Sequence, residues 1–370
     1  MKQKILFILP TLHAGGAENY TLRFIENFKD EYNYYVLSVN TEKGSLHDKF
    51  VKAGVTIIYQ SIGYFSPSKL FNFYRFLKKN KFDAICTLNG NFGGIPIMTA
   101  RYAKVTKRVA FYRRSTNAFG NSSLKLFYNK LATFAVRNYA TDILSNSEYA
   151  LQNFHAGYYK KDNRFKVISN GVNISAYNLD IPKEEAKVGF GLDKNKYTVG
   201  HVGRYDPAKN HATIFKVVQI LKQRGADIHF VLCGKDTDSD EVRLELENYG
   251  ITDYVTTLGL QENVPLVLKS FDLFYFPSVT EGQPNALIEA MFSKLPVLTS
   301  NIPPILEALP LEAHQLTLTA TDEKIAAEKI MEFANNTINE QDYIYNTWAK
   351  NKFDYEKNFN LFNDILRNGK

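Results

Sequence analysis

The sequence predicts an α/β protein that is built from two doubly wound domains. Short apolar runs, rich in β-branched and aromatic residues, alternate with longer amphipathic segments, a pattern typical of βαβ units and a mainly parallel sheet. The alternation weakens over residues 170–196, where an Asn-Gly pair and Pro182 supply turn chemistry, and then begins again. The length of 370 residues also fits two or three domains.

In the first half, each predicted strand is a short apolar run, and the predicted helices have apolar residues at helical spacing. The run from Ile5 to Leu9 follows two lysines, but it is too short for a signal peptide and has no small-residue cleavage pattern. We therefore interpret it as the first buried strand. The predicted strands cover 4–9, 34–39, 56–59, 84–87, 108–112, 142–145 and 166–168, and the predicted helices cover 16–27, 67–79, 95–103, 124–137 and 148–156.

The second half repeats the alternation and ends in helices. The predicted strands cover 197–202, 228–233, 255–258, 273–276, 297–299 and 316–318, and the predicted helices cover 212–224, 241–249, 264–270, 285–293 and 322–333. After Asn339 the chain has no β-rich run, and its aromatic residues recur at helical spacing. We expect an N-terminal domain over 1–175, a C-terminal domain over 176–345, and a helix over 346–370 that packs back toward the N-terminal domain. The ligand edges of the two sheets should face a cleft.

Charge divides the chain more sharply than its net value of +7 indicates. Residues 1–175 contain 25 Lys and Arg against 10 Asp and Glu, whereas residues 176–370 contain 20 against 28. No acid occurs from Ala84 to Thr141, a stretch that carries nine Lys and Arg. Such a region predicts an anionic partner, which could be nucleic acid, lipid headgroups or a phosphorylated substrate.

Cysteine content and hydropathy bear on the compartment. Cys86 and Cys233 each lie in an apolar run, and two such residues form no disulfide framework, so we expect a reduced, cytoplasmic protein. No stretch approaches the ~18–20 apolar residues of a membrane span. We therefore expect any membrane contact to be peripheral.

The sharpest motif is the segment 276–290, in which a buried strand leads through a Gly-containing loop to a helix. Pro284 stands where the helix begins, so the first-turn amides of Asn285, Ala286 and Leu287 are free to bind an anion such as phosphate. Glu281 precedes the helix and Glu289 lies in its second turn. Carboxylates suit the hydroxyl groups of a ribose or a sugar. The alternative is a dipole pairing at the helix start plus a surface Glu.

Each domain has a further candidate loop, which follows its first predicted strand. In the segment 200–211, Arg204 closes a strand and Lys209 precedes a helix, and together their side chains suit a diphosphate. In the segment 10–18, Gly15 and Gly16 allow close approach of a ligand to a helix start. That loop is not the G-x-G-x-x-G fingerprint, which argues against NAD. Either cation singly could instead belong to a solvated loop.

Other candidate sites in the sequence carry little weight. The acidic run 236–241 resembles a cation site, but Glu241 stands where a calcium loop needs Gly, so we predict no metal. His13, His201 and His211 lie near the predicted ligand loops, although a single His is more often structural.

Taken together, the motifs resemble the retaining GT-B glycosyltransferases of family 4, over nearly the whole chain. Glu281 to Glu289 matches the family's E-x7-E motif, the segment 203–210 its G-R…K-N motif, and the segment 15–18 its G-G-A-E loop. The segment 169–173 is similar to the N-G-V-D sequence that precedes the interdomain crossing in the family. The resemblance implies the GT-B fold, with two Rossmann-like domains facing a cleft and closing C-terminal helices.

The resemblance also implies roles for these residues. Arg204 and Lys209 would bind the donor diphosphate, Glu289 the ribose hydroxyls, and Glu281 the transferred sugar and distal phosphate together with the amides from Gly282 to Leu287. Gly15 and Gly16 would cap the diphosphate from the N-terminal domain, and Gly234 and Leu260 would lie near the base. The catalytic group would be Glu281, Arg204 and Lys209. The reaction would use a UDP- or GDP-type sugar as co-substrate, with no cofactor and no obligatory metal.

The sequence departs from the family at one place. Many relatives carry a His after the fifth N-terminal strand, near the donor sugar, whereas the segment 111–117 here contains none. Arg113, Arg114 and Asn117 are candidates for donor or acceptor contact, and the alternative is a solvated basic loop.

From the residues and the resemblance we expect a retaining glycosyltransferase that moves a sugar onto a lipid-linked glycan acceptor. We expect this reaction to serve the synthesis of a bacterial surface polysaccharide. The aromatic residues within the acid-free stretch favour an anionic membrane, so we expect a cytoplasmic protein peripheral on the inner face of the cell membrane. The alternatives are another GT-B activity, such as a soluble-acceptor or protein glycosyltransferase or a phosphorylase, and a nucleic-acid-binding protein. The acidic second half and the absence of an RNP, KH or C2H2 pattern oppose the last.

Overall fold

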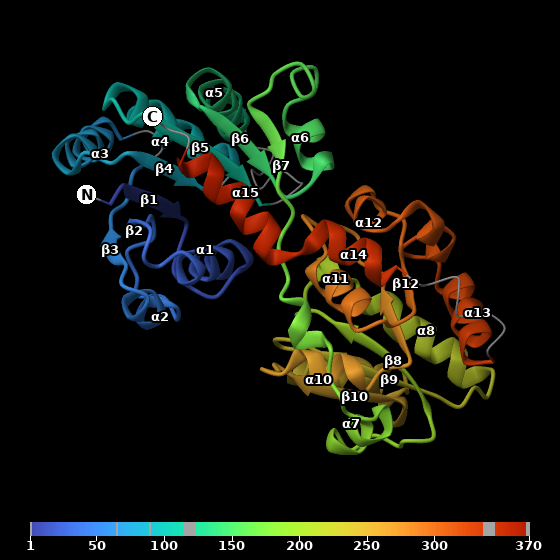
Figure 1. Cartoon of the computed structure of the whole chain (residues 1–370). Coiled ribbons are helices and arrows are strands. Elements are labelled where there is room, and N and C mark those ends of the chain that lie inside the picture. Colours follow the sequence, from blue (N-terminus) through green and yellow to red (C-terminus); the bar gives the residue numbers. More distant parts are fainter. Residues whose placement is uncertain (1, 64–65, 89, 114–122, 336–344, 368–370) are drawn as a thin grey trace. The chain divides into compact units, whose positions relative to one another are not determined.

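The computed structural model describes residues 2–63, 66–88, 90–113, 123–335 and 345–367, which form two compact units (Figure 1). The first unit comprises Met1–Asn170 with Glu356–Lys370, and the second comprises Gly171–Tyr355. Each unit contains one sheet, of seven and six strands respectively, and the paired strands within each are parallel. The predicted class, α/β with two doubly wound sheets, is confirmed.

The first sheet has the order β3-β2-β1-β4-β5-β6-β7, so successive strands are added outward from β1 on one side as far as β3 and then from β4 on the other side. Its strands are β1 Lys4–Leu9, β2 Asn33–Ser38, β3 Thr56–Tyr59, β4 Ala84–Thr87, β5 Lys107–Tyr112, β6 Asp142–Ser145 and β7 Phe165–Val167. Its helices are α1 Gly16–Asn27, α2 His47–Lys52, α3 Pro67–Asn80, α4 Gly94–Tyr102, α5 Ser123–Tyr139, α6 Glu148–Phe154 and α15 Tyr355–Arg367.

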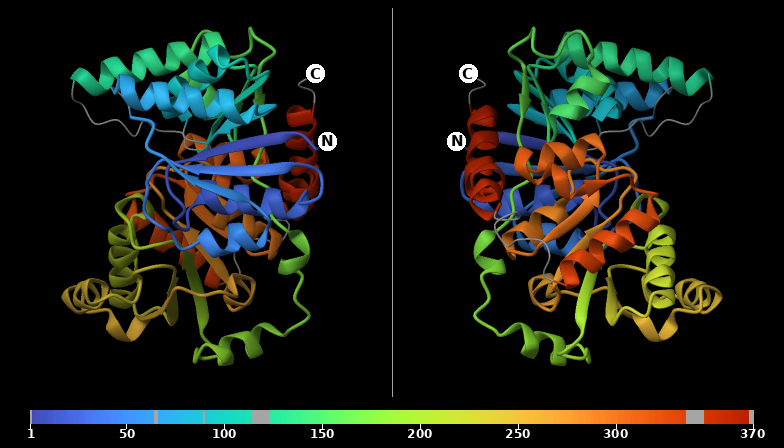
Figure 2. Two further views of the ribbon diagram at one scale, coloured as in Figure 1. Left: turned by 90° about the vertical axis from the view of Figure 1, so that its left-hand side faces the viewer. Right: turned by 90° about the vertical axis from the view of Figure 1, so that its right-hand side faces the viewer.

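Alternating side chains of the first sheet form two apolar layers. Phe7 contacts Phe24 of α1 and Phe362 of α15, with ring centroids 6.0 and 6.4 Å away. Its neighbours Leu6 and Ile8 belong instead to a buried cluster with α3, α4 and α5. Successive side chains of a strand point to opposite faces of the sheet. The helices that contact Phe7 therefore cover one face, and those that contact Leu6 and Ile8 cover the other. Figures 1 and 2 show α3, α4 and α5 beside one another on one face, and α1 and α15 on the other.

The second sheet has the order β10-β9-β8-β11-β12-β13. Its strands are likewise added outward from β8 on one side and then from β11 on the other. Its strands are β8 Tyr197–Val202, β9 Ile228–Cys233, β10 Val255–Gly259, β11 Leu273–Phe276, β12 Val297–Ser300 and β13 Thr317–Leu318. Its helices are α7 Lys183–Gly189, α8 His211–Gln223, α9 Asp240–Asn248, α10 Val264–Lys269, α11 Asn285–Phe292, α12 Pro303–Ala308, α13 Glu323–Ala334 and α14 Asn346–Phe353. In such sheets ligands bind at the carboxyl ends of the two strands where these sides meet, here β8 and β11.

The division of the chain differs from the expected one at two places. The border lies after Asn170, five residues before the predicted one, and the C-terminal region divides: α14 contacts α11 in the second unit, whereas α15 packs in the first. The backbone accounts for this border, because the Val172 amide donates to the Phe353 carbonyl at 3.0 Å. A Cβ on Gly171 would lie 2.2 Å from the Cα of Tyr355, so only glycine permits this pairing.

Three short helices escaped the sequence pattern. These are α2, α7 and α12, each six or seven residues long. Segments of this length span fewer than two turns and give no clear helical period. Pro303 and Pro304 at the start of α12 also indicate a turn, although proline is tolerated in a first helical turn. Among the helices of the described residues, none combines the length and hydropathy that a bilayer crossing requires.

Candidate functional site

The loops that follow β8, β9, β10 and β11 meet at the carboxyl edge of the second sheet, and we call them the loop cluster (residues 203–210, 234–239, 260–263 and 277–284). Backbone hydrogen bonds join them. The amide of Gly203 donates to Cys233 at 2.8 Å, and that of Gly234 donates to Gly259 at 2.8 Å. The Val279 amide donates to Ala208 at 2.9 Å. The loop cluster is therefore a connected surface.

Gly234 permits the close approach of two of these loops. Its φ of 142° lies in the region that favours glycine, and a Cβ there would lie 2.3 Å from the Gly203 carbonyl oxygen. The obstacle is backbone, which cannot rotate away as a side chain can. Glycine at this position thus sets the spacing between the β8 and β9 loops, and with it the position of Arg204.

Lys209 and Glu281 form an ion pair inside the loop cluster. The Lys209 Nζ donates to Glu281 Oε1 at 2.6 Å, and the two side chains are only 20% and 9% exposed. The same ammonium lies 5.0 Å from the centre of the Phe276 ring. The two residues are 72 positions apart in the chain, so the fold itself brings them together. An ammonium held in this way keeps donors available for a phosphate oxygen.

Local capping explains why the loop bearing Lys209 takes this shape. Asp206 accepts a hydrogen bond from the Ala208 amide at 2.9 Å, which starts a short 3-10 turn over Pro207–Lys209. Asn210 then adopts a left-handed conformation, with φ of 60°, and its side-chain amide donates to the carbonyls of Pro277 and Ala320 at 3.1 and 2.8 Å. Asn210 thereby attaches the Lys209 loop to the ends of β11 and β13.

Arg204 is an exposed cation of the loop cluster. Its side chain is 66% exposed, and Nη2 lies 3.1 Å from Asp206 Oδ2. An ion pair at this exposure is weak, about 0–1 kcal/mol, so the guanidinium can exchange Asp206 for a ligand oxygen at small cost. Leu260, which follows β10, is 75% exposed, unusual for a leucine beside a ligand edge.

The start of α11 adds an anion site to the loop cluster. Pro284 occupies the N-cap position, and the first helical hydrogen bond runs from the Ile288 amide to Pro284 at 3.1 Å. The prediction of a free amide at Asn285 is wrong, because that amide donates to the Gln283 carbonyl at 3.0 Å. The amides of Ala286 and Leu287 have no preceding helical turn to bind, and the helix dipole makes their end positive. Burial raises the pKa of Cys233 to about 11, and the charge of Glu289 adds to the rise. The charge of Glu289, in the second turn of α11, therefore acts on the end of β9.

Two buried histidines lie beneath the loop cluster. His201 Nδ1 lies 3.0 Å from the Tyr275 carbonyl oxygen, and the His201 ring packs edge-on against His211 with centroids 4.9 Å apart. Burial lowers the pKa of His211 to about 4 and lowers the pKa of His201 well below its usual value. The nearby Lys209 charge lowers both further. Both rings are neutral at pH 7, so they support the site without adding charge to it.

These histidines predict that the second unit loses stability in mild acid. An unfolded histidine binds its proton near pH 6.5, but His211 does so only near pH 4, so the unfolded state holds more protons between these values. The free energy of unfolding therefore falls as the pH drops through this window. Between pH 7 and 5, His211→Gln should lose about 1–2 kcal/mol less than the wild type. Urea unfolding at both pH values measures this, and equal losses in the two proteins would contradict it.

In the first unit, Gly15 and Gly16 lie at the start of α1. A Cβ on Gly15 would lie 2.5 Å from Glu18 Oε2, whereas a Cβ on Gly16 would meet nothing within 4 Å. Glu18 is buried, and burial raises its pKa, against the opposing effects of its own backbone hydrogen bond and the charge of Arg113. A Cβ at Gly15 would therefore require the Glu18 carboxylate to shift, whereas one at Gly16 would displace nothing.

Arg113 follows β5 and stacks on aromatic rings. Its guanidinium carbon lies 3.8 Å from the centre of the Tyr20 ring and 5.0 Å from that of Phe111. Its Nε and Nη1 are buried without a hydrogen-bond partner among the described residues, and burial lowers its pKa to about 10. The side chain is still charged at neutral pH. An unsatisfied buried donor costs about 1–3 kcal/mol, which an anionic ligand would offset.

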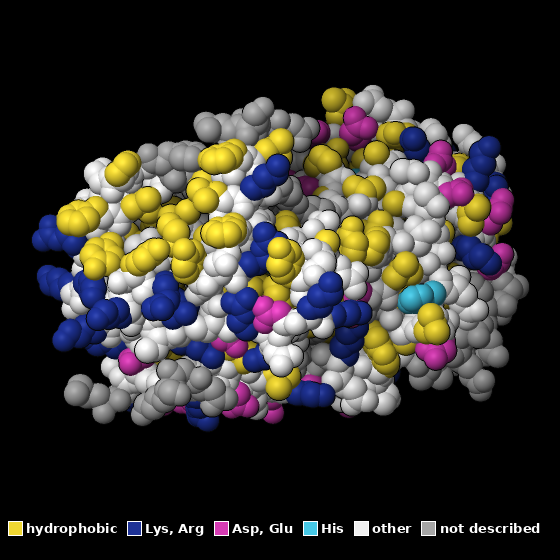
Figure 3. Space-filling view, turned by 90° about the horizontal axis from the view of Figure 1, so that it is seen from above, with side chains coloured by type: hydrophobic (Ala, Val, Ile, Leu, Met, Phe, Trp, Pro, Cys, Tyr) yellow, Lys and Arg dark blue, Asp and Glu magenta, His cyan; other side chains and the backbone are white. Residues whose placement is uncertain are grey.

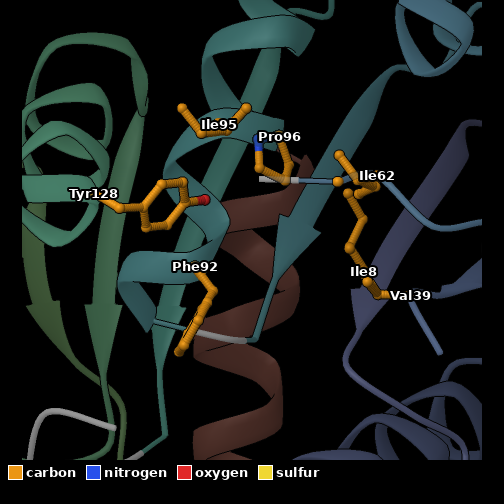
Figure 4. A pocket seen from close by; sticks show the side chains of 8 residues that line it. Ile8, Val39, Ile62, Phe92, Ile95, Pro96 and Tyr128 are labelled. Atoms are coloured by element: carbon orange, nitrogen blue, oxygen red, sulfur yellow. The ribbon is translucent and has the colours of Figure 1, made fainter. Parts of the chain in front are cut away.

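An apolar pocket lies in the first unit near the ends of its first two strands. Ile8 and Val39 line it from the β1 and β2 side, Ile95 and Pro96 from α4, and Tyr128 from α5 (Figure 4). Phe92 and Ile62 complete the labelled lining. The cavity has a volume of about 20 Å³, which is room for about one water-sized group.

The predicted residues fall into two groups. The loop cluster and the adjoining α11 contain Arg204, Lys209, Gly234, Leu260, Glu281, Gly282, Asn285, Ala286, Leu287 and Glu289. The first unit contains Gly15, Gly16 and Arg113, whereas Arg114 and Asn117 lie outside the described residues. Sequence reasoning missed Asn210 as a loop anchor, the Phe276 ring near Lys209, and the Glu18 and Tyr20 contacts with Arg113. The matching K-N motif was the available signal for Asn210.

Two protein families match the chain. The family described as Glycosyl transferases group 1 matches residues 182–350, and Glycosyltransferase Family 4 matches residues 14–176. The chain is 29% identical over 304 residues to the capsular polysaccharide biosynthesis glycosyltransferase CapH of Staphylococcus aureus, covering 81% of each chain. It is 25% identical over 371 residues to the putative glycosyltransferase EpsF of Bacillus subtilis, covering 96% of this chain and 94% of the relative.

A third relative and a solved structure extend the comparison. The chain is 28% identical over 244 residues to the UDP-Gal:alpha-D-GlcNAc-diphosphoundecaprenol alpha-1,3-galactosyltransferase of Escherichia coli, covering 63% of this chain and 61% of the relative. The crystal structure of Anabaena Alr3699/HepE in complex with UDP and glucose has a TM-score of 0.81 at 18% identity and covers 99% of this chain and 100% of that one. With both halves matched and this fold shared, the chain belongs to the group 1, family 4 glycosyltransferases of GT-B fold.

Proposed function

We propose that the protein is a retaining glycosyltransferase that moves a sugar from a UDP- or GDP-sugar onto a lipid-linked glycan during bacterial surface polysaccharide synthesis. The observation that carries this is the Lys209 ammonium, held 2.6 Å from Glu281 in the loop cluster that adjoins the first-turn amides of Ala286 and Leu287 on α11. The products would include capsule, O-antigen or exopolysaccharide. The names of the CapH and Escherichia coli relatives support a polysaccharide product and a diphospholipid acceptor.

Departure of the nucleoside diphosphate is the step that these charges would assist. Negative charge grows on the diphosphate as the bond to the anomeric carbon breaks, and fixed donors at that position lower the barrier. We assign this role to Lys209, Arg204 and the amides of Ala286 and Leu287. Glu281 would hold Lys209 in position and accept a hydrogen bond from a sugar hydroxyl. No metal is needed when cations and amides supply this charge.

The nucleoside would lie over the ends of β9 and β10. The charge of Glu289 acts on Cys233 at the end of β9, so we assign its carboxylate to the ribose hydroxyls. Gly234 and the exposed side chain of Leu260 would pack beside the base. A hydroxyl donating to a carboxylate forms one of the stronger protein hydrogen bonds, about 1.5–3 kcal/mol.

We assign the acceptor to the first unit. The buried donors of Arg113 need an anion, and the diphosphate of a lipid-linked glycan is one. Arg114 and Asn117 would extend the acceptor contacts. An anionic membrane on the inner face of the cell would present such an acceptor.

Ribose recognition tests the donor assignment. Titration calorimetry with UDP and 2′-deoxy-UDP, and with the guanosine pair, should show that the wild type binds one ribonucleotide about 10–100-fold more tightly than its deoxy form. Glu289→Ala should bind both forms alike, whereas Glu247→Ala, an exposed glutamate on α9, should behave as the wild type. Retained discrimination in Glu289→Ala would contradict the assignment.

A further inference from the structure

The outer surface of α3, α4 and α5, which we call the helical layer, has an unusual charge. These helices contain eight Lys and Arg and no Asp or Glu. Between Asp48 and Asp142 the chain has a single acid, Asp83, whose carboxylate accepts a hydrogen bond from the Lys4 amide at 2.8 Å. That acid lies at the start of β4, at the opposite edge of the sheet from the strand ends where ligands bind. The helical layer is therefore uniformly basic.

Large apolar side chains cover the same surface. Phe71, Tyr102, Phe127 and Phe134 are 51–62% exposed, although each has a bulk that normally lies inside a protein. Among the described residues, the fifth aromatic side chain with comparable exposure is Tyr158, which stacks 4.1 Å from the guanidinium of Arg137 on α5. Figure 3 shows hydrophobic side chains gathered over this unit, at the left of the view, with Lys and Arg side chains along their border.

The spacing on α5 explains how one helix can be buried and yet expose apolar residues. Tyr128, Ala132, Ala135 and Val136 face the core and are at most 2% exposed. Phe127, Leu131 and Phe134 follow at i, i+4 and i+7 on another face, beside exposed Lys130. Helix α5 thus has two apolar faces, of which the protein covers one. An exposed apolar stripe with interspersed cations is the pattern of helices that lie in a membrane interface.

Charge selects the occupant of this surface. A second copy would place eight further cations against the first eight, and the two basic surfaces would repel each other. A nucleic acid would pair with the cations but leave Phe127 and Phe134 in water or against phosphates. A bilayer with anionic headgroups satisfies both features, because its headgroups pair with Lys and Arg while its acyl boundary receives the aromatic rings.

We infer that the helical layer is the membrane-docking surface of the protein, with an anionic phospholipid bilayer as its partner. Phe127, Leu131 and Phe134 enter the acyl boundary, and Arg101, Lys104 and Lys130 contact the headgroups. This inference rests on the membrane location in the proposed function and adds the surface that makes the contact. Docking through the helical layer would hold the apolar pocket next to the lipid, since α4 and α5 contribute to both.

Vesicle flotation tests the surface. The full chain should float with phosphatidylcholine vesicles that contain phosphatidylglycerol and remain at the bottom with phosphatidylcholine alone at the same salt. Phe127→Ser/Phe134→Ser should weaken binding at least tenfold, and Arg101→Gln/Lys130→Gln should weaken it about tenfold or more, since each cation near the surface contributes roughly fivefold. Leu244→Ser/Leu311→Ser and Lys216→Gln/Lys324→Gln, exposed residues of the second unit, are the matched controls.

The possible outcomes separate the inference from the function. Unaltered flotation of both helical-layer variants, equal binding to neutral vesicles, or no binding at all would overturn the docking surface. A wild type that is dimeric by light scattering and becomes monomeric in Phe127→Ser/Phe134→Ser would also overturn it, in favour of a second copy. Nucleotide titration in solution tests the proposed function separately. If the protein binds nucleotides but not vesicles, the docking surface is wrong and the donor assignment stands. If it binds vesicles but no nucleotide, the docking surface stands and the donor assignment is wrong.

Discussion

Lys209→Ala is expected to lower the rate of sugar transfer by about 100–1000-fold, the usual cost of losing one fixed donor to developing charge. It should also lower the affinity for a nucleoside diphosphate by about 10–100-fold, the value of one hydrogen bond to a charged group. The Lys209 side chain is only 20% exposed, and Glu281 holds its ammonium in position. A cation from the solvent would therefore not replace the missing ammonium in the variant. Titration calorimetry with the preferred nucleotide gives the affinity. Lys216→Ala on α8, an exposed lysine of the same unit, should behave as the wild type.

The same substitution should also destabilise the second unit, because it removes the positive charge that faces the Glu281 carboxylate, whose side chain is 9% exposed. The double variant Lys209→Ala/Glu281→Gln removes the negative charge as well. We expect it to recover most of the lost unfolding free energy while its nucleotide affinity stays low. If the double variant bound nucleotide as the wild type does, Lys209 would be a structural residue only.

Gly234→Ala is expected to cost about 2–4 kcal/mol of unfolding free energy, since it combines a left-handed backbone with a collision between backbone atoms. The new Cβ would lie 2.3 Å from the Gly203 oxygen, so the β8 and β9 loops must separate. The Arg204 amide lies 3.0 Å from the same Cβ position, so nucleotide binding should weaken together with stability. Urea unfolding and nucleotide titration measure the two effects.

Gly225→Ala is the matched control, because it measures the cost of the left-handed backbone conformation without a collision. Gly225 also has a positive φ, of 69°, but a Cβ there would meet nothing within 4 Å. It should therefore show only the cost of the left-handed conformation, about 1–2 kcal/mol, with unchanged nucleotide affinity. Equal losses in the two variants would show that the contact between the β8 and β9 loops is not tight.

Much of the fold follows from short-range pattern. The alternation of apolar runs predicted β1 and α1 over the residues that form them, because a buried strand followed by an amphipathic helix has an unambiguous period. Helices α2, α7 and α12 were missed because one or two turns give too little period. The division of the C-terminal region was also hidden, since α14 and α15 have similar aromatic spacing, and only their packing partners distinguish them.

The candidate site was predictable as a set of residues but not as an arrangement. Motif spacing identified Lys209 and Glu281 separately as ligand contacts, whereas their ion pair depends on loops 72 residues apart. The need for glycine at Gly234 depends on the Gly203 carbonyl, which no local pattern indicates. Likewise, Arg113 was chosen as a basic loop residue, and its stacking on Tyr20 requires β5 and α1 to be neighbours.

The most direct test of the account is transfer of labelled sugar from nucleotide donors to a bacterial lipid extract. Purified protein is incubated with that extract and with radiolabelled UDP- or GDP-sugars, and label is measured in the butanol-soluble fraction. We expect transfer from one class of nucleotide sugar, with the anomeric configuration retained in the product, and a strong loss of transfer in Lys209→Ala. The proposed function would be contradicted if no nucleotide sugar labelled the extract, or if sugar were exchanged only with inorganic phosphate and without a nucleotide.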